Sequence, residues 1–493
     1  MNAHSGKRQG ARLAPELSVA LRDRIRGSKQ QALWLATMAF FGGFAGVAIF
    51  GPLVPRFQEL MGLSPLQAGT LAAAANLTGS LLRIPFGAWA DRAGGRRPFL
   101  TLLGLTLTGV GGLLWLLRTH YPDRLAGLYP VLLLLGALAG CGIATFSVGI
   151  GQVSYWFARR EQGGALGVFA GLGNLAPGIS SGLLPVAVAS LGILAGYGLW
   201  FGALAAITAV YALAIYDAPS FQVRAQGREL NPDELAALGQ ELAPAATFSA
   251  SMGIAVWEAA TWVLVSFYFT SFGGFLALVV WLPSYWHAMY NLSLIQAGLL
   301  TLVFAEVTSL VRVPAGLLAD RLSIRYALQG NFALIGAGAL TVAVSQSLAL
   351  SVAGILMMGL GMGLQNGIVF KLLPQYVPEA VGSAAGLVGG LGAFGGFLIP
   401  PAMGALVQVL GAPLGYARGF ALFEFLVAFD LLLVWWLVER SQGRAAIAHV
   451  PVRFLCLSPT CELREQARSQ VPIKFVCLRP ACRSHPNTQS LKR

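Results

Sequence analysis

The stretch "LLRIPFGAWADRAGGRR" at residues 81–97 decides the fold of this chain, because it closes an apolar run with a basic, glycine-rich turn. Its first part recurs as "LVRVPAGLLADR" at residues 310–321. The segment ahead of it, "LSPLQAG" (63–69), recurs as "LSLIQAG" (292–298) at the same interval. Repeats that keep one interval over two segments indicate that the chain consists of two related halves with the same orientation.

The composition of the chain places those halves in a lipid environment. The chain has 493 residues, of which 56% are hydrophobic and 11% are charged, whereas soluble proteins carry roughly 25% charged residues. Too few polar side chains remain to cover a soluble protein, so that class is excluded. Runs of about 20 apolar residues, long enough to cross a bilayer, mark the predicted membrane spans. The twelve spans lie near 33–54, 66–90, 98–117, 126–157, 163–190, 193–216, 255–285, 293–319, 325–346, 349–371, 380–409 and 414–438.

These spans predict an all-α membrane protein, with twelve transmembrane helices arranged as two six-helix pseudo-repeats. One long polar break separates the halves, and its "NPDELAALGQEL" segment is typical of a short surface helix. The predicted regions are a basic N-terminus at 1–30, an N-terminal six-helix bundle at 31–216, a linker at 217–254, a C-terminal six-helix bundle at 255–440 and a basic tail at 441–493.

The formal net charge of +13 belongs almost entirely to residues 1–30 and 441–493. Because the apolar body is nearly neutral, the charge gives no reason to expect a nucleic-acid partner. Basic residues also gather in the loops on one side of the predicted bundle, and the positive-inside rule then places both termini in the cytoplasm. The start of the chain carries no pattern of a cleavable signal peptide, so we expect a multi-pass protein of the cell (inner) membrane. The loop residues are Arg92, Arg96, Arg97, Arg159, Arg160, Arg224, Arg228, Arg321 and Arg325.

A glycine turn that presents an acid and its basic neighbours follows the second span, and a decayed copy follows the eighth. Charges held in this way at the ends of neighbouring helices make contacts whose rupture can accompany a conformational switch. The pattern resembles the loop signature of the major facilitator superfamily, which implies a transporter fold. The predicted switch residues are Gly87, Asp91, Arg92, Gly95 and Arg96 in the first copy and Asp320 and Arg321 in the second.

Two arginines occupy equivalent depths in the two halves. Arg83 and Arg312 each precede the motif aspartate by two helical turns, which places them roughly 12 Å into the membrane. Charged residues at that depth are costly and are functional candidates. Neither has a carboxylate three or four residues away, so neither has a partner on its own helix.

Two guanidinium groups without local partners predict an anion site between the halves. The planar fork of arginine suits a planar oxyanion such as nitrate, nitrite, carboxylate or bicarbonate. The alternative is that each arginine pairs across helices with Glu306, Glu424 or Asp430.

The chain also resembles the nitrate/nitrite porter family of the major facilitator superfamily over about residues 30–440. The stretches "GGALGVFAGLGNLAPGIS" (163–180) and "GSAAGLVGGLGAFGGFLIP" (382–400) are similar to that family's two nitrate signatures, and "QNGIVFKLLPQ" (365–375) is similar to its span 10 pattern. The resemblance implies nitrate or nitrite transport by alternating access, without a cofactor. The substrate-binding residues that it implies, with the signature glycines, are Arg83, Arg312, Asn174, Tyr268, Phe272, Phe146, Gly171, Gly390 and Asn366.

The mode of coupling stays open between nitrate/nitrite exchange and proton-linked uptake. Glu306 is an acid well inside a span near Arg312 and is a candidate proton carrier, with His287 at the outer mouth as another. A structural role for Glu306 is an equal alternative. A porter for bicarbonate or a carboxylate is the second hypothesis for function. We expect no enzyme, because the sequence has no cluster of catalytic carboxylates, metal ligands or nucleophile with its base.

The tail after residue 440 contains a duplicated segment, "VPVRFLCLSPTC" (450–461) and "VPIKFVCLRPAC" (471–482). A duplicated or shifted reading frame explains such a basic, repetitive segment, while zinc binding by its four cysteines is a weaker alternative. We therefore expect no metal site, no cofactor, and a monomer in the bilayer. The four cysteines are Cys456, Cys461, Cys477 and Cys482.

Overall fold

The computed structural model describes residues 25–228, 234, 248–312, 315 and 323–448. Two compact units divide the chain, Met1–Ser441 and Gln442–Arg493. The candidate site residues described in the structure lie in the first unit. The tail cysteines, the second motif copy with Asp320 and Arg321, and most of the predicted linker helix lie outside the described residues.

The described residues form helices and turns, without a strand. The first half of the chain forms α2 (Lys29–Phe44), η1 (Ala45–Ala48), η2 (Gly51–Leu53), α3 (Val54–Met61), α4 (Pro65–Leu81), α5 (Arg83–Ala93), α6 (Arg96–His120), α7 (Tyr129–Gly140), η3 (Cys141–Ala144), α8 (Thr145–Ser154), α9 (Arg159–Gly173), α10 (Ala176–Leu191), α11 (Ile193–Ala214) and α12 (Pro219–Arg224). The second half forms α14 (Phe248–Trp257), α15 (Ala259–Tyr268), η4 (Phe269–Gly273), α16 (Gly274–Tyr290), α17 (Leu294–Leu310), α19 (Ile324–Val344), α20 (Leu348–Tyr376), η5 (Pro378–Ala380), α21 (Val381–Ala393), α22 (Gly395–Leu410), α23 (Leu414–Arg418) and α24 (Ala421–Ala448).

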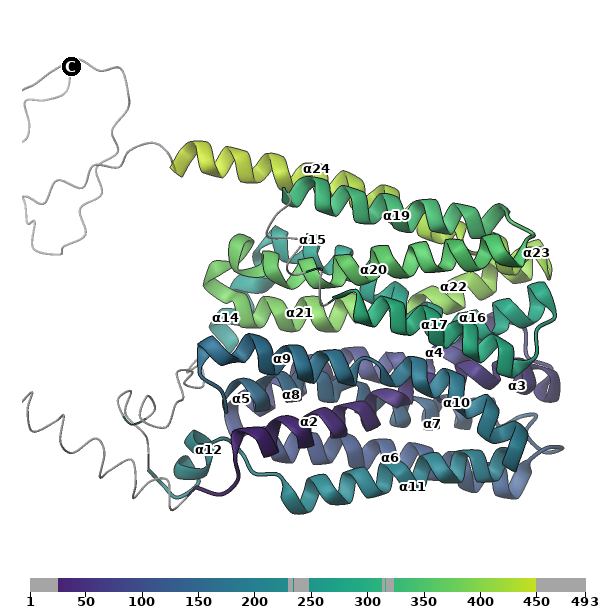
Figure 1. The fold of residues 1–493 in the computed structure, drawn as a ribbon, viewed down its shortest axis with the longest axis horizontal. Coiled ribbons are helices and arrows are strands. Elements are labelled where there is room, and N and C mark those ends of the chain that lie inside the picture. Colours follow the sequence, from purple (N-terminus) through teal and green to yellow (C-terminus); the bar gives the residue numbers. More distant parts are fainter. Residues whose placement is uncertain (1–24, 229–233, 235–247, 313–314, 316–322, 449–493) are drawn as a thin grey trace, which may run out of the picture. The chain divides into compact units, whose positions relative to one another are not determined.

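The long helices run side by side along one direction, as a membrane bundle requires (Figure 1). Ten helical segments of the described chain are long and apolar enough to cross a bilayer. α17 is apolar but shorter, and α4 and α5 follow each other with the turn residue Leu82 between them. Over the described residues, each of the predicted spans coincides with one of these segments, so the predicted all-α membrane fold is confirmed.

The sequence repeat reappears as a repeated local structure. Ser64 caps α4, and its hydroxyl accepts from the backbone N–H of Gln67, whose side chain accepts from the N–H of Ser64. Ser293 and Gln296 form the same reciprocal pair at the start of α17. Such a capping box satisfies two backbone donors at a helix start. The repeated "LS-x-x-QAG" pattern therefore starts equivalent helices in the two halves.

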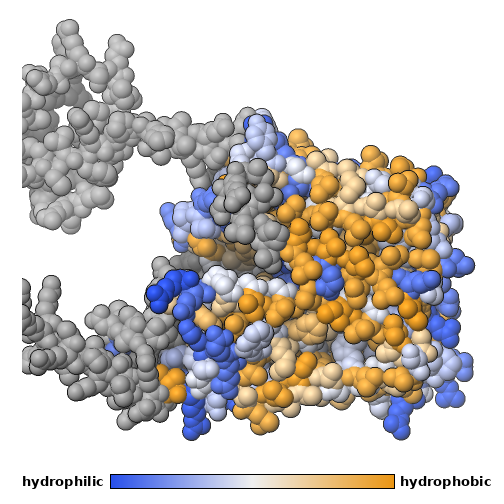
Figure 2. Space-filling model, viewed as in Figure 1, coloured by the Kyte–Doolittle hydropathy of each residue, from blue (hydrophilic) through white to orange (hydrophobic). Residues whose placement is uncertain are grey.

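Large apolar side chains are exposed around the bundle, among them Trp115, Leu134, Leu213 and Phe425. Figure 2 shows a broad apolar field on one face, with hydrophilic residues gathered at the two ends. Contiguous exposed apolar surface of this kind marks contact with lipid. The chain is therefore a multi-pass membrane protein.

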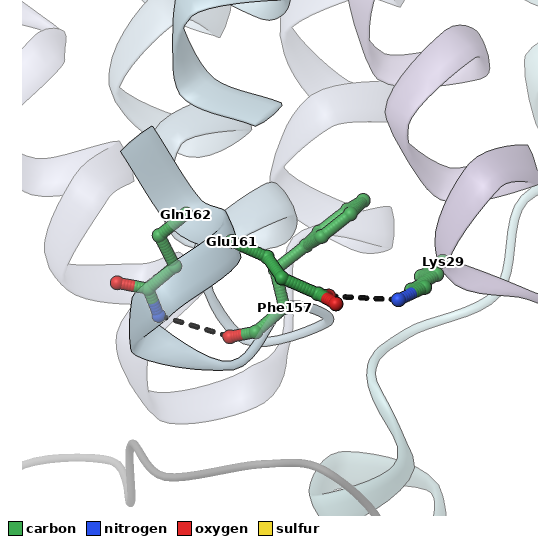
Figure 3. A network of polar contacts seen from close by, with 4 residues as sticks. All are labelled: Lys29, Phe157, Glu161 and Gln162. Atoms are coloured by element: carbon green, nitrogen blue, oxygen red, sulfur yellow. Dashed lines mark hydrogen bonds and ion pairs between the residues drawn. The ribbon is translucent and has the colours of Figure 1, made fainter. Parts of the chain in front are cut away.

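We call the end where α2 begins and α11 ends the tail end, and the end that carries α3 and the start of α17 the far end (Figure 1). At the tail end Lys29 and Glu161 form an ion pair of 2.7 Å between the starts of α2 and α9, and Gln162 donates to the carbonyl of Phe157 (Figure 3). Both charged side chains are substantially exposed, so the pair adds little stability.

Candidate functional site

Arg83 lies at the break between α4 and α5, and its side chain is 1% exposed. Its Nη1 donates to the carbonyl of Gly389 in α21 at 3.2 Å. The Nε and Nη2 atoms are buried and have no hydrogen-bond partner. Buried donors in native proteins are nearly always satisfied, so two orphan N–H groups on one buried cation indicate a place for an acceptor.

Arg312 follows α17 and is half-buried. Its Nη2 lies 3.3 Å from the hydroxyl oxygen of Tyr268, to which it donates, and its Nη1 is buried without a partner. In both arginines, therefore, the protein satisfies only part of the hydrogen-bonding capacity of the guanidinium group.

The alternative that each arginine pairs with an acid of another helix is wrong for the described residues. The ion pairs between those residues join neither arginine to Glu306, Glu424 or Asp430. Asp430 instead accepts from the Ser266 hydroxyl at 2.6 Å. Each of the three acids keeps one buried carboxyl oxygen without a partner.

The aromatic ring of Phe272 lies against both cations. The guanidinium carbon of Arg83 is 5.0 Å from the ring centroid, and that of Arg312 is 5.1 Å from it. Arg83 also lies 5.1 Å from the ring of Phe146. Cations within about 6 Å of an aromatic centroid are attracted by the ring quadrupole. One ring therefore brings together two like charges that the sequence places in separate halves.

A local change of helix type presents that ring. Residues Phe269–Gly273 form a π-helical turn between α15 and α16, and such turns occur frequently at functional sites. The Tyr268 and Phe272 rings stack with centroids 4.8 Å apart and planes 14° apart. Phe370 of α20 meets Tyr268 edge-on at 5.1 Å. This stack holds the Tyr268 hydroxyl and the Phe272 ring on the same side of the two arginines.

Two buried amides were also predicted for the site. The Asn174 side chain donates to the carbonyl of Ala170, and its Oδ1 atom has no partner. Asn366 lies one turn before Phe370 in α20, and both of its amide atoms are buried without a partner. Each amide is therefore free to form at least one further hydrogen bond in the interior of the bundle.

Close helix contacts seal the far end. A Cβ atom on Gly69 of α4 would lie 2.5 Å from the carbonyl oxygen of Pro400 in α22, and one on Gly298 of α17 would lie 2.5 Å from that of Ser181 in α10. The Asn76 amide donates across the first of these contacts to the carbonyl of Gly396 at 3.0 Å. Glycine is required here because it lets backbones approach this closely.

The predicted signature glycines divide into two kinds. A Cβ on Gly171 of α9 or on Gly386 of α21 would meet no atom within 4 Å. A Cβ on Gly390 would instead lie 2.9 Å from Ile84, next to the carbonyl that accepts from Arg83. Gly171 and Gly386 therefore lie on open faces of α9 and α21, whereas Gly390 lets α21 pack against the start of α5.

The first motif copy forms a compact turn between α5 and α6. Gly94 has φ +85°, and a Cβ on it would overlap the carboxylate of Asp217. That carboxylate accepts from the backbone N–H of Arg96 at 2.8 Å, while Gln152 accepts from the N–H of Gly95 at 3.1 Å. Left-handed backbone and close approach together explain why the turn needs glycine. The motif acid Asp91 accepts from the hydroxyl of Tyr155 at 3.1 Å.

Burial raises the pKa of Asp91 above its ordinary value of 3.8, although the hydrogen bond from Tyr155 lowers it. A carboxyl whose pKa is raised by folding contributes stability below its ordinary pKa, and that contribution is lost as the pH rises through the raised value. We expect Asp91→Asn to gain stability relative to the wild type as the pH rises above the ordinary pKa of the carboxyl group. Thermal unfolding at a series of pH values checks this, and parallel profiles for the two proteins would contradict it.

The sequence did not point to every partner in this region. Gly389, Asp217 and Gln152 were not predicted, because a backbone carbonyl or a loop acid carries no pattern that identifies a partner more than 50 residues away. Asp217 had one usable signal, since it is an isolated acid at the end of a span, level with the basic motif.

Comparison with known proteins gives matches over most of the chain. Residues 33–400 and 295–478 match the model of the Major Facilitator Superfamily. A protein of Thermus thermophilus named "Probable nitrate/nitrite antiporter NarK1" is 32% identical over 421 residues, covering 79% of this chain and 88% of that protein. The "Nitrite extrusion protein" of Bacillus subtilis is 27% identical, covering 82% and 93%. "Probable nitrate transporter NarT" of Staphylococcus epidermidis is 26% identical, covering 84% and 97%.

Solved structures share the fold at low identity. The xylose transporter XylE from E. coli, in a partially occluded inward open conformation, superimposes with a TM-score of 0.65 at 14% identity, covering 84% of this chain and 98% of that one. A bacterial homologue of the human lysosomal transporter Spinster superimposes with a TM-score of 0.57 at 14% identity, covering 83% and 96%.

Proposed function

The chain belongs to the Major Facilitator Superfamily, and on that premise we propose that it is a secondary active transporter for nitrate, nitrite or both. Transport proceeds by alternating access, in which the two bundles open the central site to one side of the membrane at a time. The names of the curated relatives support nitrate and nitrite over bicarbonate or a carboxylate. The superfamily supports a transporter rather than a membrane enzyme.

The observation that carries the substrate class is the pair of partly satisfied arginines on one aromatic ring. Arg83 and Arg312 present three buried guanidinium nitrogens without partners. Nitrate is flat and carries its charge on three oxygens in one plane, so guanidinium forks bind its edge while aromatic rings cover its faces. In this proposal Phe272 and Phe146 are the aromatic walls, and Tyr268 orients Arg312.

Asn174 and Asn366 complete the proposed site with amide groups that hydrogen bond the substrate. Gly171 and Gly390 belong to it through backbone geometry, the first on an open helix face and the second at the contact beside Arg83.

The charge of the loops supports the orientation of the proposed transporter. Basic loop residues lie at the tail end, and the positive-inside rule therefore makes that end cytoplasmic and the sealed far end external. The protein then sits in the cell (inner) membrane as a monomer with both termini inside. Gly87, Asp91, Arg92, Gly95 and Arg96 act in this proposal as the conformational switch at the cytoplasmic end, and Asp320 and Arg321 are their counterparts in the second half.

Uptake of labelled nitrate into proteoliposomes tests the proposal. Vesicles are loaded with or without nitrite, and the pH gradient is clamped independently. Stimulation by internal nitrite indicates exchange, and stimulation by an inward proton gradient indicates proton-linked uptake. Inhibition by nitrite but not by equimolar bicarbonate or acetate is expected. Absence of uptake above protein-free vesicles in every condition would contradict the proposal.

Loss of one hydroxyl should weaken nitrate binding to a limited degree. Tyr268→Phe removes the acceptor of Arg312 and leaves another guanidinium N–H unpaired, at a cost of about 1–1.5 kcal/mol. We expect the KM for nitrate to rise about five- to tenfold, as measured by initial uptake rates. Tyr290→Phe is the matched control, because its hydroxyl contacts Ser351 at the far end. Equal KM values for Tyr268→Phe and the wild type would exclude this role.

A further inference from the structure

The four helices that seal the far end contain one charged side chain. α4, α10, α17 and α22 are described over their full lengths, and Glu306 of α17 is the acid among them. An ionisable group in an otherwise apolar membrane interface is costly and is a functional candidate by default.

Contacts between α10 and α17 form a regular ladder that descends from the far end. Gly298 faces Ser181, and a Cβ on Gly182 would lie 2.6 Å from Leu302. One turn further, a Cβ on Gly178 would lie 2.5 Å from the Oε1 atom of Glu306. The glycine therefore forms a notch in α10 that accommodates the carboxyl group of the opposite half.

The next contact between α17 and the α9–α10 segment links the notch to residues of the proposed anion site. The Ser309 hydroxyl donates to the backbone carbonyl of Asn174 at 3.1 Å, next to the unpaired amide oxygen of that residue. Arg312 follows within one further turn of the chain. Glu306 thus lies between the far-end seal and the proposed anion site.

The carboxyl group lacks a partner in its notch. The Oε1 atom of Glu306 is buried and makes no hydrogen bond. Glu306 is half-buried, and Leu299, Val303 and Leu310 on the same side of α17 are 45%, 44% and 59% exposed, so the carboxyl group lies where the contact with α10 meets the apolar outer surface of the bundle. An ionised carboxylate in this position would be neither solvated nor paired, whereas a protonated carboxyl group is tolerated.

The helices packed against α17 supply no compensating charge at this level. α10 and η2 contain no titratable side chain. The titratable groups of α16 are Tyr285, His287 and Tyr290, which lie toward the far end, where His287 is hydrogen-bonded to the carbonyl of Leu292. Those of α20 are Lys371 and Tyr376, which lie at its opposite end.

We propose that Glu306 is the proton-binding residue of the far-end seal, so that the seal closes only over its protonated form. The inference rests on the proposed function, because alternating access requires that α10 and α17 separate at the far end and pack again in each cycle. When they separate, the notch opens to water and the carboxyl group ionises. When they pack, it binds a proton from the far side before it enters the notch.

The consequence is a pH dependence of transport itself, independent of any driving gradient. Nitrate/nitrate exchange is measured with the same pH on both sides of the membrane. Above the pKa of Glu306 in the open state, each pH unit lowers the protonated fraction about tenfold, and the exchange rate of the wild type is expected to fall by up to that factor. Glu306→Gln, which stays neutral, is expected to exchange nitrate at a rate that does not change with pH.

Asp430→Asn is the matched control, since Asp430 is also a buried acid without a cation but lies in the second half against Ser266. Its exchange should keep the wild-type pH profile. The same pH profile in Glu306→Gln and the wild type, or a flat profile in the wild type, would overturn the proposal while leaving nitrate transport intact. Absence of exchange in the wild type at every pH would instead overturn the proposed function.

A second variant applies if Glu306→Gln does not reach the membrane in folded form. Gly178→Ala places a methyl group against the carboxyl oxygen and displaces it from the notch without removing the acid. The midpoint of its pH profile is expected to shift from that of the wild type. An unmoved midpoint with normal exchange at low pH would count against the notch.

Discussion

Arg83→Ala and Arg312→Ala are each expected to lower nitrate uptake at least about thirtyfold, because removal of one partner from a buried charge pair costs about 2–5 kcal/mol. Arg83 should be the more sensitive of the two, since it is 1% exposed and has two orphan guanidinium nitrogens. Each variant leaves the other arginine without the shared anion. Initial rates of labelled nitrate uptake in proteoliposomes measure the effect.

Two controls separate charge from geometry. Arg83→Lys keeps the positive charge but loses the planar fork, so we expect it to recover only a small part of the uptake. Arg118→Ala removes an arginine in the last turn of α6, outside the site, and should transport as the wild type does. Wild-type uptake by both site variants would remove the basis for the anion site.

Gly69→Ala and Gly298→Ala are expected to lower nitrate uptake about tenfold by hindering closure of the far end. Each new methyl group would lie 2.5 Å from a backbone carbonyl oxygen of the opposite half, and overpacking of this kind costs about 1–3 kcal/mol. Because the site residues are unchanged, equilibrium binding of nitrate to the purified variants should stay close to the wild-type value.

Gly198→Ala provides the matched control, as a Cβ at this position of α11 meets no atom within 4 Å. It should leave both uptake and binding unchanged. Full uptake by Gly69→Ala and by Gly298→Ala would mean that the far-end contacts do not limit the transport cycle.

The sequence predicted those features that depend on short-range patterns. Apolar run length gave the spans, and the repeated Ser and Gln spacing gave equivalent helix starts at Ser64 and Ser293. The depth of Arg83 followed from helix rise and the position of the motif, and the structure places it in the buried interior. Periodicity and composition suffice for such predictions because each depends on neighbouring residues alone.

Features that depend on tertiary contacts could not be predicted from the sequence. The π-helical turn at Phe269–Gly273 has no distinctive composition, although it sets the position of the ring that both arginines share. Gly171 and Gly178 both belong to the glycine-rich stretch 163–180, yet Gly171 lies on an open face whereas Gly178 forms a notch for a carboxyl group. Only the opposing helix distinguishes these roles.

Equilibrium binding of labelled nitrate to the purified protein tests the anion site most directly, because it needs neither a driving gradient nor a complete transport cycle. We expect saturable binding to the wild type that nitrite displaces, and loss of at least about 2 kcal/mol of binding free energy in Arg83→Ala and in Arg312→Ala. Binding of equal affinity to the wild type and to both variants would contradict it.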